Sequence, residues 1–469
     1  MSDKKSRADE RAAARAAADD AAAREDLERV YAHIVSRAPE HDVAPTIDDR
    51  VGRLLELLGD PQRSFRVIHL TGTNGKSSTA RMTERLVREH GLRTGLFTSP
   101  HLTSVTERIC VDGEPLGAAR FVEVWHDVHP YVQVVDAELT EAGRSPLHFF
   151  EVLTAMAFAA FADTPVDVAV LEVGMGGTWD CTNTADADVA VVTPISVDHE
   201  RWLGSTPAEI AEVKAGIIKP GSIAVTAEQR PEVDEVLAER VAQVGARMLR
   251  EDVELEVVDR RVAVGGQLVA LRTPAATYTE IFVPLHGEHQ AHNALLALAS
   301  VEQLLGGRVL DGGVVETAFA DVAVPGRLEL VRSSPTVLVD VAHNPHGARA
   351  LVAALDEAFT LRTVVGVVGI MADKDAEGML AELEPAFAHV VLTRSSSDRS
   401  ADPIDVAEVA REIFGEDRVH VTERLDEALQ VATNLAEADD AVGVGTGTGV
   451  VVTGSVVTVA DARILLGRG

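Results

Sequence analysis

The sequence has little cysteine and no long apolar run. Two cysteines, Cys110 and Cys181, occur in 469 residues. This excludes a small fold held together by disulfides and favours a reducing compartment such as the cytoplasm. No apolar run approaches the ~18 residues that a membrane span requires, and the N-terminus lacks the apolar core of a secretory signal. We therefore expect a cytoplasmic protein that does not bind membranes.

Positive charge is also scarce. Lys and Arg number 43 against 74 Asp and Glu, which gives a formal net charge of −31. Because a nucleic-acid backbone needs a basic surface, this balance argues against nucleic acid as the main partner. Any phosphate group must be held by a local site. The length predicts two or three domains at ~100–200 residues each.

Short β-branched runs alternate with longer helical stretches from Arg66 onward. This alternation is typical of an α/β fold with a mostly parallel sheet. Near-continuous apolar runs predict strands that are covered on both faces. Between residues 253 and 283 the pattern changes to alternating strands with a Gly265-Gly266 turn, which predicts an antiparallel hairpin. The strands predicted for the first part of the chain are 66–70, 94–98, 166–173 and 188–193.

Residues 71–78 (TGTNGKSS) lie between the first predicted strand and a predicted helix over 79–90. In that context, backbone N–H groups and a helix N-terminus surround phosphate oxygens. Leu70 stands where the general pattern has glycine, so the match is to Gly-Lys-Ser and its context. The alternative is a glycine turn with an incidental lysine. The residues predicted to bind a nucleotide here are Thr73, Asn74, Gly75, Lys76, Ser77 and Ser78.

This loop resembles the phosphate loop of the Mur ligase superfamily of ATP-dependent, amide-forming ligases. Three further segments narrow the resemblance to the folylpolyglutamate synthase/dihydrofolate synthase family, which the chain matches from about residue 45 to its end. These segments are 97–102 (FTSPHL), 171–177 (LEVGMGG) and 340–346 (DVAHNPH). The resemblance implies an enzyme that adds L-glutamate to a pteroate or folate, with ATP forming an acyl phosphate from the carboxylate. Such transfer needs in-line positioning and positive charge, which Lys76 and Mg²⁺ would supply.

We expect three segments along the chain. Residues 1–44 form a charged, Ala-rich tail and leading helix, of which the first 25 or so residues are solvated. A large phosphate-loop domain over 45–324 resembles the ATP-binding domain of the Mur ligases. A smaller C-terminal α/β ligase domain over 325–469 begins after Val324-Pro325-Gly326.

Magnesium prefers oxygen ligands, which the Ser77 and Ser99 hydroxyls and the Glu172 carboxylate provide. Glu172 follows an apolar run, at the strand end where open α/β sheets bind ligands. The resemblance implies that Ser99 and Glu172 bind magnesium, and that His199 binds a second ion. The alternatives are a helix cap or surface carboxylate for Glu172, a turn residue for Ser99 and a hydrogen-bonded loop residue for His199.

Lys214 is expected on a helix whose start is marked by Thr206, Pro207 and Glu209. The resemblance implies that Lys214 reacts with carbon dioxide to form a carbamate near the metal ions. That reaction needs a neutral amine, which burial of a lysine favours. The alternative is an exposed helix lysine paired with Glu209 or Glu212.

Four more residues are assigned by the resemblance to ATP and glutamate. Asn293, Arg327 and Asp340 would contact the nucleotide, and guanidinium geometry suits a bidentate phosphate contact. His343 would lie near the incoming glutamate and the phosphate, as a catalytic residue with Lys76 and Lys214. The alternatives are a helix cap for Asn293, a strand-end cap for Asp340 and a loop histidine for His343.

Two segments, 149–151 and 179–183, resemble the folate-contacting segments of the family, so the resemblance assigns the folate site to them. Phe150 could stack on the pterin, and Asp180 could pair with its amino edge. Thr178 stands where many relatives have arginine. Ser455 is a candidate for the glutamate site. A core phenylalanine pair is the alternative for Phe150, and a C-terminal strand hydroxyl is the alternative for Ser455.

Two other functions stay open from the sequence. One is a Mur-type ligase that acts on a peptidoglycan precursor. The other is a non-catalytic, nucleotide-dependent switch, which would need Lys76 and Ser77 but not Lys214, Glu172 and His343. We expect ATP and one or two Mg²⁺ ions as cofactors, small-molecule substrates as the only partners, and a monomer.

Overall fold

The computed structural model describes residues 2–38, 50–438 and 447–468, with side chains from residue 19 onward. The chain divides into two compact units. The first unit holds residues 1–72 and 87–248, and the second holds residues 73–86 and 249–469. The α/β prediction is confirmed, since both large sheets are mostly parallel. No helix in the described part of the chain is long and apolar enough to cross a membrane.

An eight-stranded sheet with strand order β4-β3-β2-β5-β1-β6-β7-β8 forms the framework of the first unit. The pairs β2–β5, β5–β1, β1–β6 and β6–β7 are parallel, and β3 and β4 are antiparallel. Because carboxyl ends of parallel strands meet at one edge, the loops after β1, β2, β5 and β6 share that edge. The strands are β1 (Arg66–Thr71), β2 (Thr94–Phe97), β3 (Ile109–Val111), β4 (Glu114–Pro115), β5 (Val168–Glu172), β6 (Val189–Val192), β7 (Ile223–Thr226) and β8 (Arg247–Arg250).

Helices pack an apolar core against this sheet. One cluster joins the sheet residues Phe97 and Leu171 to α1, α2, α4 and α5, and a second joins Val192 and Ala224 to α7 and α8. The helices of the first unit are α1 (Ser2–Val35), α2 (Arg50–Leu57), α4 (Ala118–Glu141), α5 (Phe149–Asp163), α6 (Glu200–Leu203), α7 (Pro207–Lys214) and α8 (Pro231–Val244). Short 3-10 helices cover Pro61–Arg63, Val105–Arg108, Cys181–Thr184, Ala215–Ile217 and, in the second unit, Glu416–Arg418.

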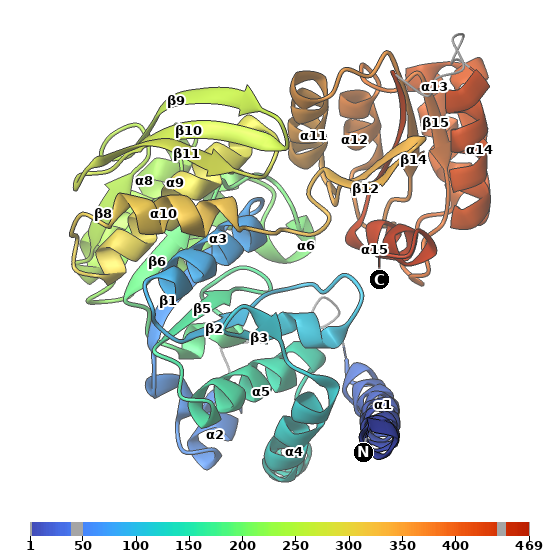
Figure 1. Cartoon of the computed structure of the whole chain (residues 1–469). Helices are drawn as coiled ribbons and strands as arrows, with labels where there is room; N and C mark the ends of the chain where they lie inside the picture. The colour runs from blue at the N-terminus through green and yellow to red at the C-terminus, as the bar shows by residue number, and fades with distance from the viewer. Residues whose placement is uncertain (1, 39–49, 439–446, 469) are drawn as a thin grey trace. The chain divides into compact units, whose positions relative to one another are not determined.

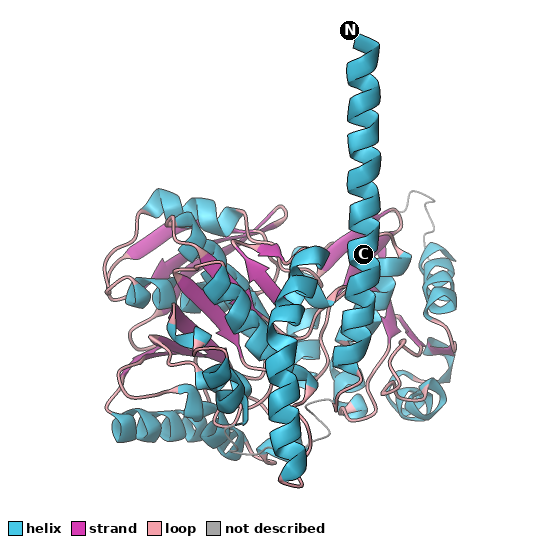
Figure 2. Ribbon diagram, turned by 90° about the horizontal axis from the view of Figure 1, so that it is seen from below, coloured by secondary structure: helices cyan, strands magenta, loops and turns pink. Residues whose placement is uncertain are grey.

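Helix α1 is continuous over its whole length (Figure 2). Most side chains over 19–25 are exposed, as predicted for the solvated tail. From Leu27 onward the helix packs beside α4 (Figure 1), and Val30 and Ile34 are buried there. The segment is therefore a solvated tail only in part, because its apolar residues begin where the helix meets α4.

The second unit contains the predicted hairpin within a three-stranded antiparallel sheet of order β11-β10-β9. Its strands are β9 (Glu256–Ala263), β10 (Gly266–Arg272) and β11 (Thr277–Val283), so the turn lies at Gly265, as predicted. Helices α3 (Lys76–Glu89), α9 (Glu288–Leu304) and α10 (Gly312–Ala320) precede the C-terminal sheet.

A six-stranded sheet of order β12-β13-β17-β14-β15-β16 completes the second unit, and only its edge strand β12 is antiparallel. Helices α11, α12 and α13 share one apolar core with the sheet, and α14 and α15 pack on β17 (Figure 1). The strands are β12 (Glu329–Ser333), β13 (Thr336–Val339), β14 (Thr363–Val368), β15 (His389–Leu392), β16 (Val419–Val421) and β17 (Thr448–Thr453). The helices are α11 (Pro345–Ala358), α12 (Ala376–Leu383), α13 (Pro403–Phe414), α14 (Leu425–Ala438) and α15 (Val456–Leu465).

Candidate active site

The loop after β1 has the backbone of a phosphate cradle. Gly72 has φ 141° and Gly75 has φ 87°, conformations that favour glycine. A Cβ on Gly72 would lie 1.9 Å from Oγ1 and 2.9 Å from the carbonyl oxygen of Thr193. Lys76 begins α3, and its Nζ donates to the Thr73 carbonyl at 3.1 Å. The loop therefore places a helix N-terminus and a lysine together, which suits phosphate oxygens.

Glu172 is the last residue of β5 and is 1% exposed. It lies opposite Leu70 of β1, and its Oε2 accepts a hydrogen bond from the Ser99 backbone N–H at 3.3 Å. The structure therefore brings Glu172 and Ser99 together at the strand edge where the phosphate loop begins. The alternative of a surface carboxylate or a helix cap for Glu172 is wrong.

His199 is exposed and precedes α6 with φ 54°. Its backbone N–H donates to Asp198 Oδ1 at 2.8 Å. Among the described residues, no group of three or more His, Cys, Asp or Glu side chains is gathered so that it could hold a metal. The metal roles of His199 and Ser77 stay predictions, and so do those of Ser99 and Glu172.

Lys214 ends α7 and is 4% exposed, so the alternative of a solvated helix lysine is wrong. Its Nζ donates to the carbonyl of Gly72, the first glycine of the phosphate loop, at 2.8 Å. The Glu209 carboxylate accepts from the Thr206 backbone N–H in the predicted capping box at the start of α7. A buried lysine beside the phosphate loop is unusual, because the charged form of the side chain is costly to bury.

The glycine turn after β5 packs on the same helix end. The backbone N–H and the hydroxyl of Thr178 donate to the Val213 carbonyl at 2.8 and 2.9 Å. A Cβ on Gly177 would lie 2.7 Å from the carbonyl oxygen of Lys214. Thr178 thus fixes the loop to α7.

Asp340 follows β13 and accepts from the Leu328 and Ala342 backbone N–H groups at 2.8 and 2.9 Å. Burial raises the pKa of Asp340, and the charge of Arg327 opposes this shift. The two backbone hydrogen bonds are what the alternative of a strand-end cap predicts. The effect of Arg327 on the pKa shows that the two charged groups also interact electrostatically. A nucleotide role for either residue stays a prediction.

His343 lies in the loop before α11, where its Nδ1 is 2.9 Å from the Val341 carbonyl. Since a carbonyl oxygen accepts, Nδ1 is the donor in this contact. Its catalytic role stays a prediction.

Asn293 is 3% exposed and lies within α9, so the alternative of a cap for the following helix is wrong. Its Nδ2 donates to Gln290 Oε1 at 3.0 Å, and its Oδ1 would be 2.6 Å from a Cβ on Gly75. Ser455 caps α15 by accepting from the Thr458 N–H at 3.1 Å, so it is not a strand hydroxyl. The ligand roles of Asn293 and Ser455 stay predictions.

Phe150 packs in an apolar core of the first unit. It is 3% exposed and stacks on Phe97 with ring centroids 5.4 Å apart. This packing is that of the core alternative, and the substrate role of Phe150 stays a prediction. Asp180 is also buried, and its oxygens accept from the Met175 and Thr182 N–H groups at 3.0 and 2.9 Å. Burial raises the pKa of Asp180, and these contacts make it a cap within its loop.

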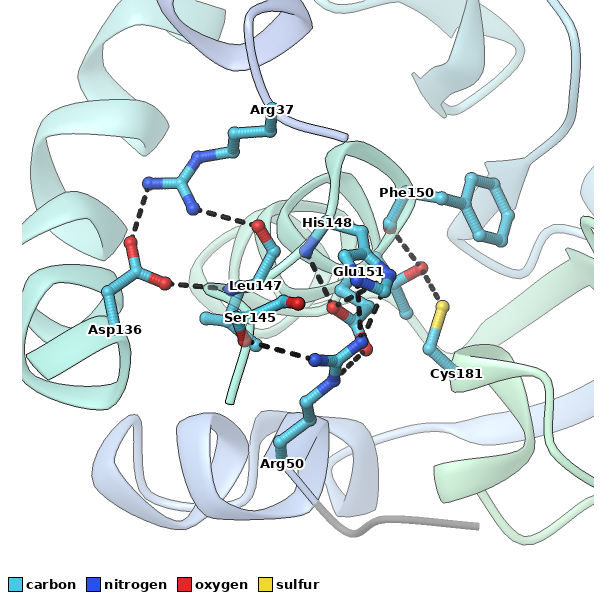
Figure 3. Close-up of polar contacts among 10 residues, drawn as sticks. Arg37, Arg50, Asp136, Ser145, Leu147, His148, Phe150, Glu151 and Cys181 are labelled. Carbon is cyan, nitrogen blue, oxygen red and sulfur yellow. Dashed lines mark hydrogen bonds and ion pairs between the residues drawn. The ribbon is translucent and has the colours of Figure 1, made fainter. Parts of the chain in front are cut away.

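Sequence reasoning missed an arginine network around the start of α5 (Figure 3). Arg50 is 7% exposed, and its Nε donates to Glu151 Oε1 at 2.7 Å while Nη2 reaches the His148 ring at 2.9 Å. Arg37 bridges Asp136 and the Leu147 carbonyl at 2.8 and 2.9 Å. The only sequence signal was the His148-to-Glu151 capping-box spacing. The two arginines hold the loop before α5 in place.

A phosphate loop after β1, a carboxylate that ends β5 and a second α/β sheet occur together in this chain, and two family models identify the class as the Mur ligases. The model of the Mur ligase middle domain matches residues 135–301, and that of the Mur ligase, glutamate ligase domain matches residues 326–448.

Two relatives narrow the class. Dihydrofolate synthase/folylpolyglutamate synthase of Mycobacterium tuberculosis is 49% identical over an alignment of 449 positions, and the match covers 92% of each chain. Folylpolyglutamate synthase of Lacticaseibacillus casei is 36% identical over 349 residues, 73% of this chain and 80% of the relative. The chain belongs to the folylpolyglutamate synthase/dihydrofolate synthase family, which confirms the resemblance.

Solved structures of folylpolyglutamate synthases are also similar to this chain. M. tuberculosis folylpolyglutamate synthase complexed with ADP has a TM-score of 0.91 at 48% identity and covers 95% of this chain and 99% of that one. An FPGS-AMPPCP-folate complex has a TM-score of 0.81 at 32% identity and covers 94% and 99%.

Proposed function

We propose that this chain is an ATP-dependent ligase that adds L-glutamate to dihydropteroate, to reduced folates or to both. One observation carries the proposal. The sheet edge at the end of β1 holds the start of a phosphate loop, the buried Glu172 carboxylate and the buried Lys214, whose Nζ contacts Gly72 at 2.8 Å. The family's relatives that bind an ATP analogue and folate support the choice of substrates.

The chemistry follows from the poor electrophilicity of a carboxylate. The substrate carboxylate attacks the γ-phosphorus of ATP, ADP leaves, and an acyl phosphate forms. The amine of glutamate then attacks the acyl carbon, phosphate leaves, and the amine loses a proton. Lys76 and the N-terminus of α3 offer positive charge to the transferring group.

Magnesium would be held by oxygen ligands, which the Ser77 hydroxyl, the Ser99 hydroxyl and the Glu172 carboxylate supply. When bound, it neutralises negative charge on the phosphates. We assign His199 to a second ion. The magnesium roles of Glu172 and Ser99 are supported by the contact at 3.3 Å between the Glu172 carboxylate and the Ser99 backbone N–H, which holds these two residues side by side.

Lys214 is proposed to carry a carbamate. Burial favours the neutral amine. That amine adds to carbon dioxide and releases a proton, which gives an anion that a cation can neutralise. A carbon-13 NMR signal from labelled carbon dioxide should appear in the native chain and vanish in Lys214→Arg. A signal that persists in the variant would contradict the assignment.

Other residues complete the proposal. We assign Asn293, Arg327 and Asp340 to the nucleotide, and His343 and Ser455 to the glutamate end. The support is that the charge of Arg327 opposes the rise that burial causes in the pKa of Asp340, so these two residues interact electrostatically. We also propose cytoplasmic localisation, a monomer with small-molecule substrates, and the segment division at residues 44 and 324.

The test supplies the purified chain with ATP, Mg²⁺, glutamate and one acceptor at a time, and ADP release is measured. Release with dihydropteroate or tetrahydrofolate is expected. Release only with a muramyl nucleotide would favour a peptidoglycan ligase, and no release with any acceptor would favour a switch. Lys76→Met should lose ADP release while its far-UV circular dichroism stays native. Full activity in that variant would refute the phosphate-loop assignment.

A further inference from the structure

The Asn74 side chain of the phosphate loop is bonded to the start of α11. Its Oδ1 accepts from Asn344 Nδ2 at 3.1 Å, and its Nδ2 donates to Asn344 Oδ1 at 3.4 Å. The same Nδ2 donates to His346 Nδ1 at 3.2 Å. The amide of Asn74 thus uses its acceptor and its donor within the protein.

Asn344 is fixed by a second task. It is 4% exposed, and its Oδ1 accepts from the Gly347 N–H at 2.8 Å as the N-cap of α11. Turning the amide over would place its NH₂ against that N–H, so the cap sets the orientation of Asn344. This orientation in turn fixes Asn74, whose Nδ2 needs His346 Nδ1 as an acceptor.

We propose that Asn74, Asn344 and His346 form an amide clasp that positions the catalytic segments for ligation. The clasp joins the loop that carries Lys76, two residues after Asn74, to the loop that carries His343, the residue before Asn344. Asn74 is then a positioning residue, and its side chain is not a nucleotide ligand. This inference rests on the proposed function.

The need for such a clasp is geometric. Acyl transfer requires reacting atoms about 3–3.5 Å apart, and a misplacement of about 1 Å costs ~10²-fold in rate. Two hydrogen-bonded amides hold a loop more closely than one bond, because both bonds must break before the loop can shift. Their contribution should therefore appear in the rate of the chemical step.

The test uses a variant that keeps the helix cap. Asn344→Ser retains an N-cap hydroxyl but is too short to reach Asn74. Asn74→Ala removes the pair from the other side. Each variant should lower kcat about tenfold or more, with little change in the KM for ATP. Because both remove the same pair, the double variant should be no worse than the single ones.

The matched control is Asp375→Ser, which changes the cap of the neighbouring helix α12. Asp375 accepts from the Gly378 N–H at 2.8 Å, as Asn344 does from Gly347. Its kcat should equal that of the native chain. A raised KM for ATP at native kcat in Asn74→Ala would overturn the proposal, because Asn74 would then be a nucleotide ligand. The proposal would also be overturned if the fold-reductions in kcat of the two single variants multiplied in the double variant.

A second readout needs no turnover. Hydrogen–deuterium exchange over 340–350 should be faster in Asn74→Ala than in the native chain, because the clasp holds that segment. Unchanged exchange would show that no clasp exists. If exchange is faster in Asn74→Ala but the native chain releases no ADP with any acceptor, the clasp exists and its role in ligation is overturned. Failure of the proposed function is thereby separated from failure of the clasp.

Discussion

Gly75 offers a sharp test of the phosphate loop, because the chain contains a matched glycine. Gly75 and Gly221 both have φ 87°, so an alanine at either position carries the strain of a positive φ. That strain is about 1–3 kcal/mol for a non-glycine residue, and the gain from a less flexible unfolded chain is also shared. The two sites differ in their surroundings. A Cβ on Gly75 would lie 2.6 Å from Asn293 Oδ1, and one on Gly221 would meet nothing within 4 Å.

The extra cost at Gly75 follows from what holds Asn293. To move, its side chain must give up the hydrogen bond at 3.0 Å to Gln290, and both residues are buried. An unsatisfied buried partner costs about 1–3 kcal/mol. We therefore expect the free energy of unfolding of Gly75→Ala to be lower than that of Gly221→Ala by about 1–3 kcal/mol.

Urea unfolding of both variants measures this difference, provided that the m-values agree. In an Asn293→Ala background the obstructing atom is gone, so Gly75→Ala should then cost no more than Gly221→Ala. Equal losses from the two glycine variants in the native background would refute the reasoning. They would mean that the loop does not press against α9.

Two further predictions concern buried charge. Burial raises the pKa of Glu302 above its ordinary 4.5, so the folded chain keeps a proton that the unfolded chain loses, and stability falls as pH rises above 4.5. Glu302→Gln lacks this titration, so its free energy of unfolding relative to the native chain should grow between pH 4.5 and neutrality in urea titrations; a constant difference would contradict the buried acid. Arg50→Met should destabilise the chain by about 3–5 kcal/mol in the same assay, since it leaves the Glu151 carboxylate, at 2.7 Å in the native chain, without its ion-pair partner. Arg50→Met/Glu151→Gln should recover part of that loss, and no recovery would show that the ion pair is not the cause.

Local features were predictable because neighbours in the sequence determine them. The strand–glycine loop–helix succession at 71–78, the capping box of Thr206 and Glu209, and the turn at Gly265 were all predicted from adjacent residues, and each is present. A cap or a glycine turn depends on backbone dihedrals over a few residues. The family resemblance, carried by short segments of this kind, was predictable for the same reason.

The side-chain environments were not predictable to the same degree. Phe150 was expected at the substrate, and the structure places it in the core against Phe97. A helix at this position has apolar residues on nearly every face, so the sequence does not show which ring is covered. No residue near Arg50 in the sequence indicated its role, because its partners begin 95 residues later in the chain.

The sequence by itself determined the class of fold, the phosphate loop and the family, since each is written in contiguous residues. Only the tertiary structure decided that Lys214 is buried against Gly72, 142 residues away, and that Asn74 meets Asn344, 270 residues away. The physical reason is that these contacts depend on which strands become neighbours and how helices pack on them. That choice is made by the free energy of the whole chain and not by any local pattern.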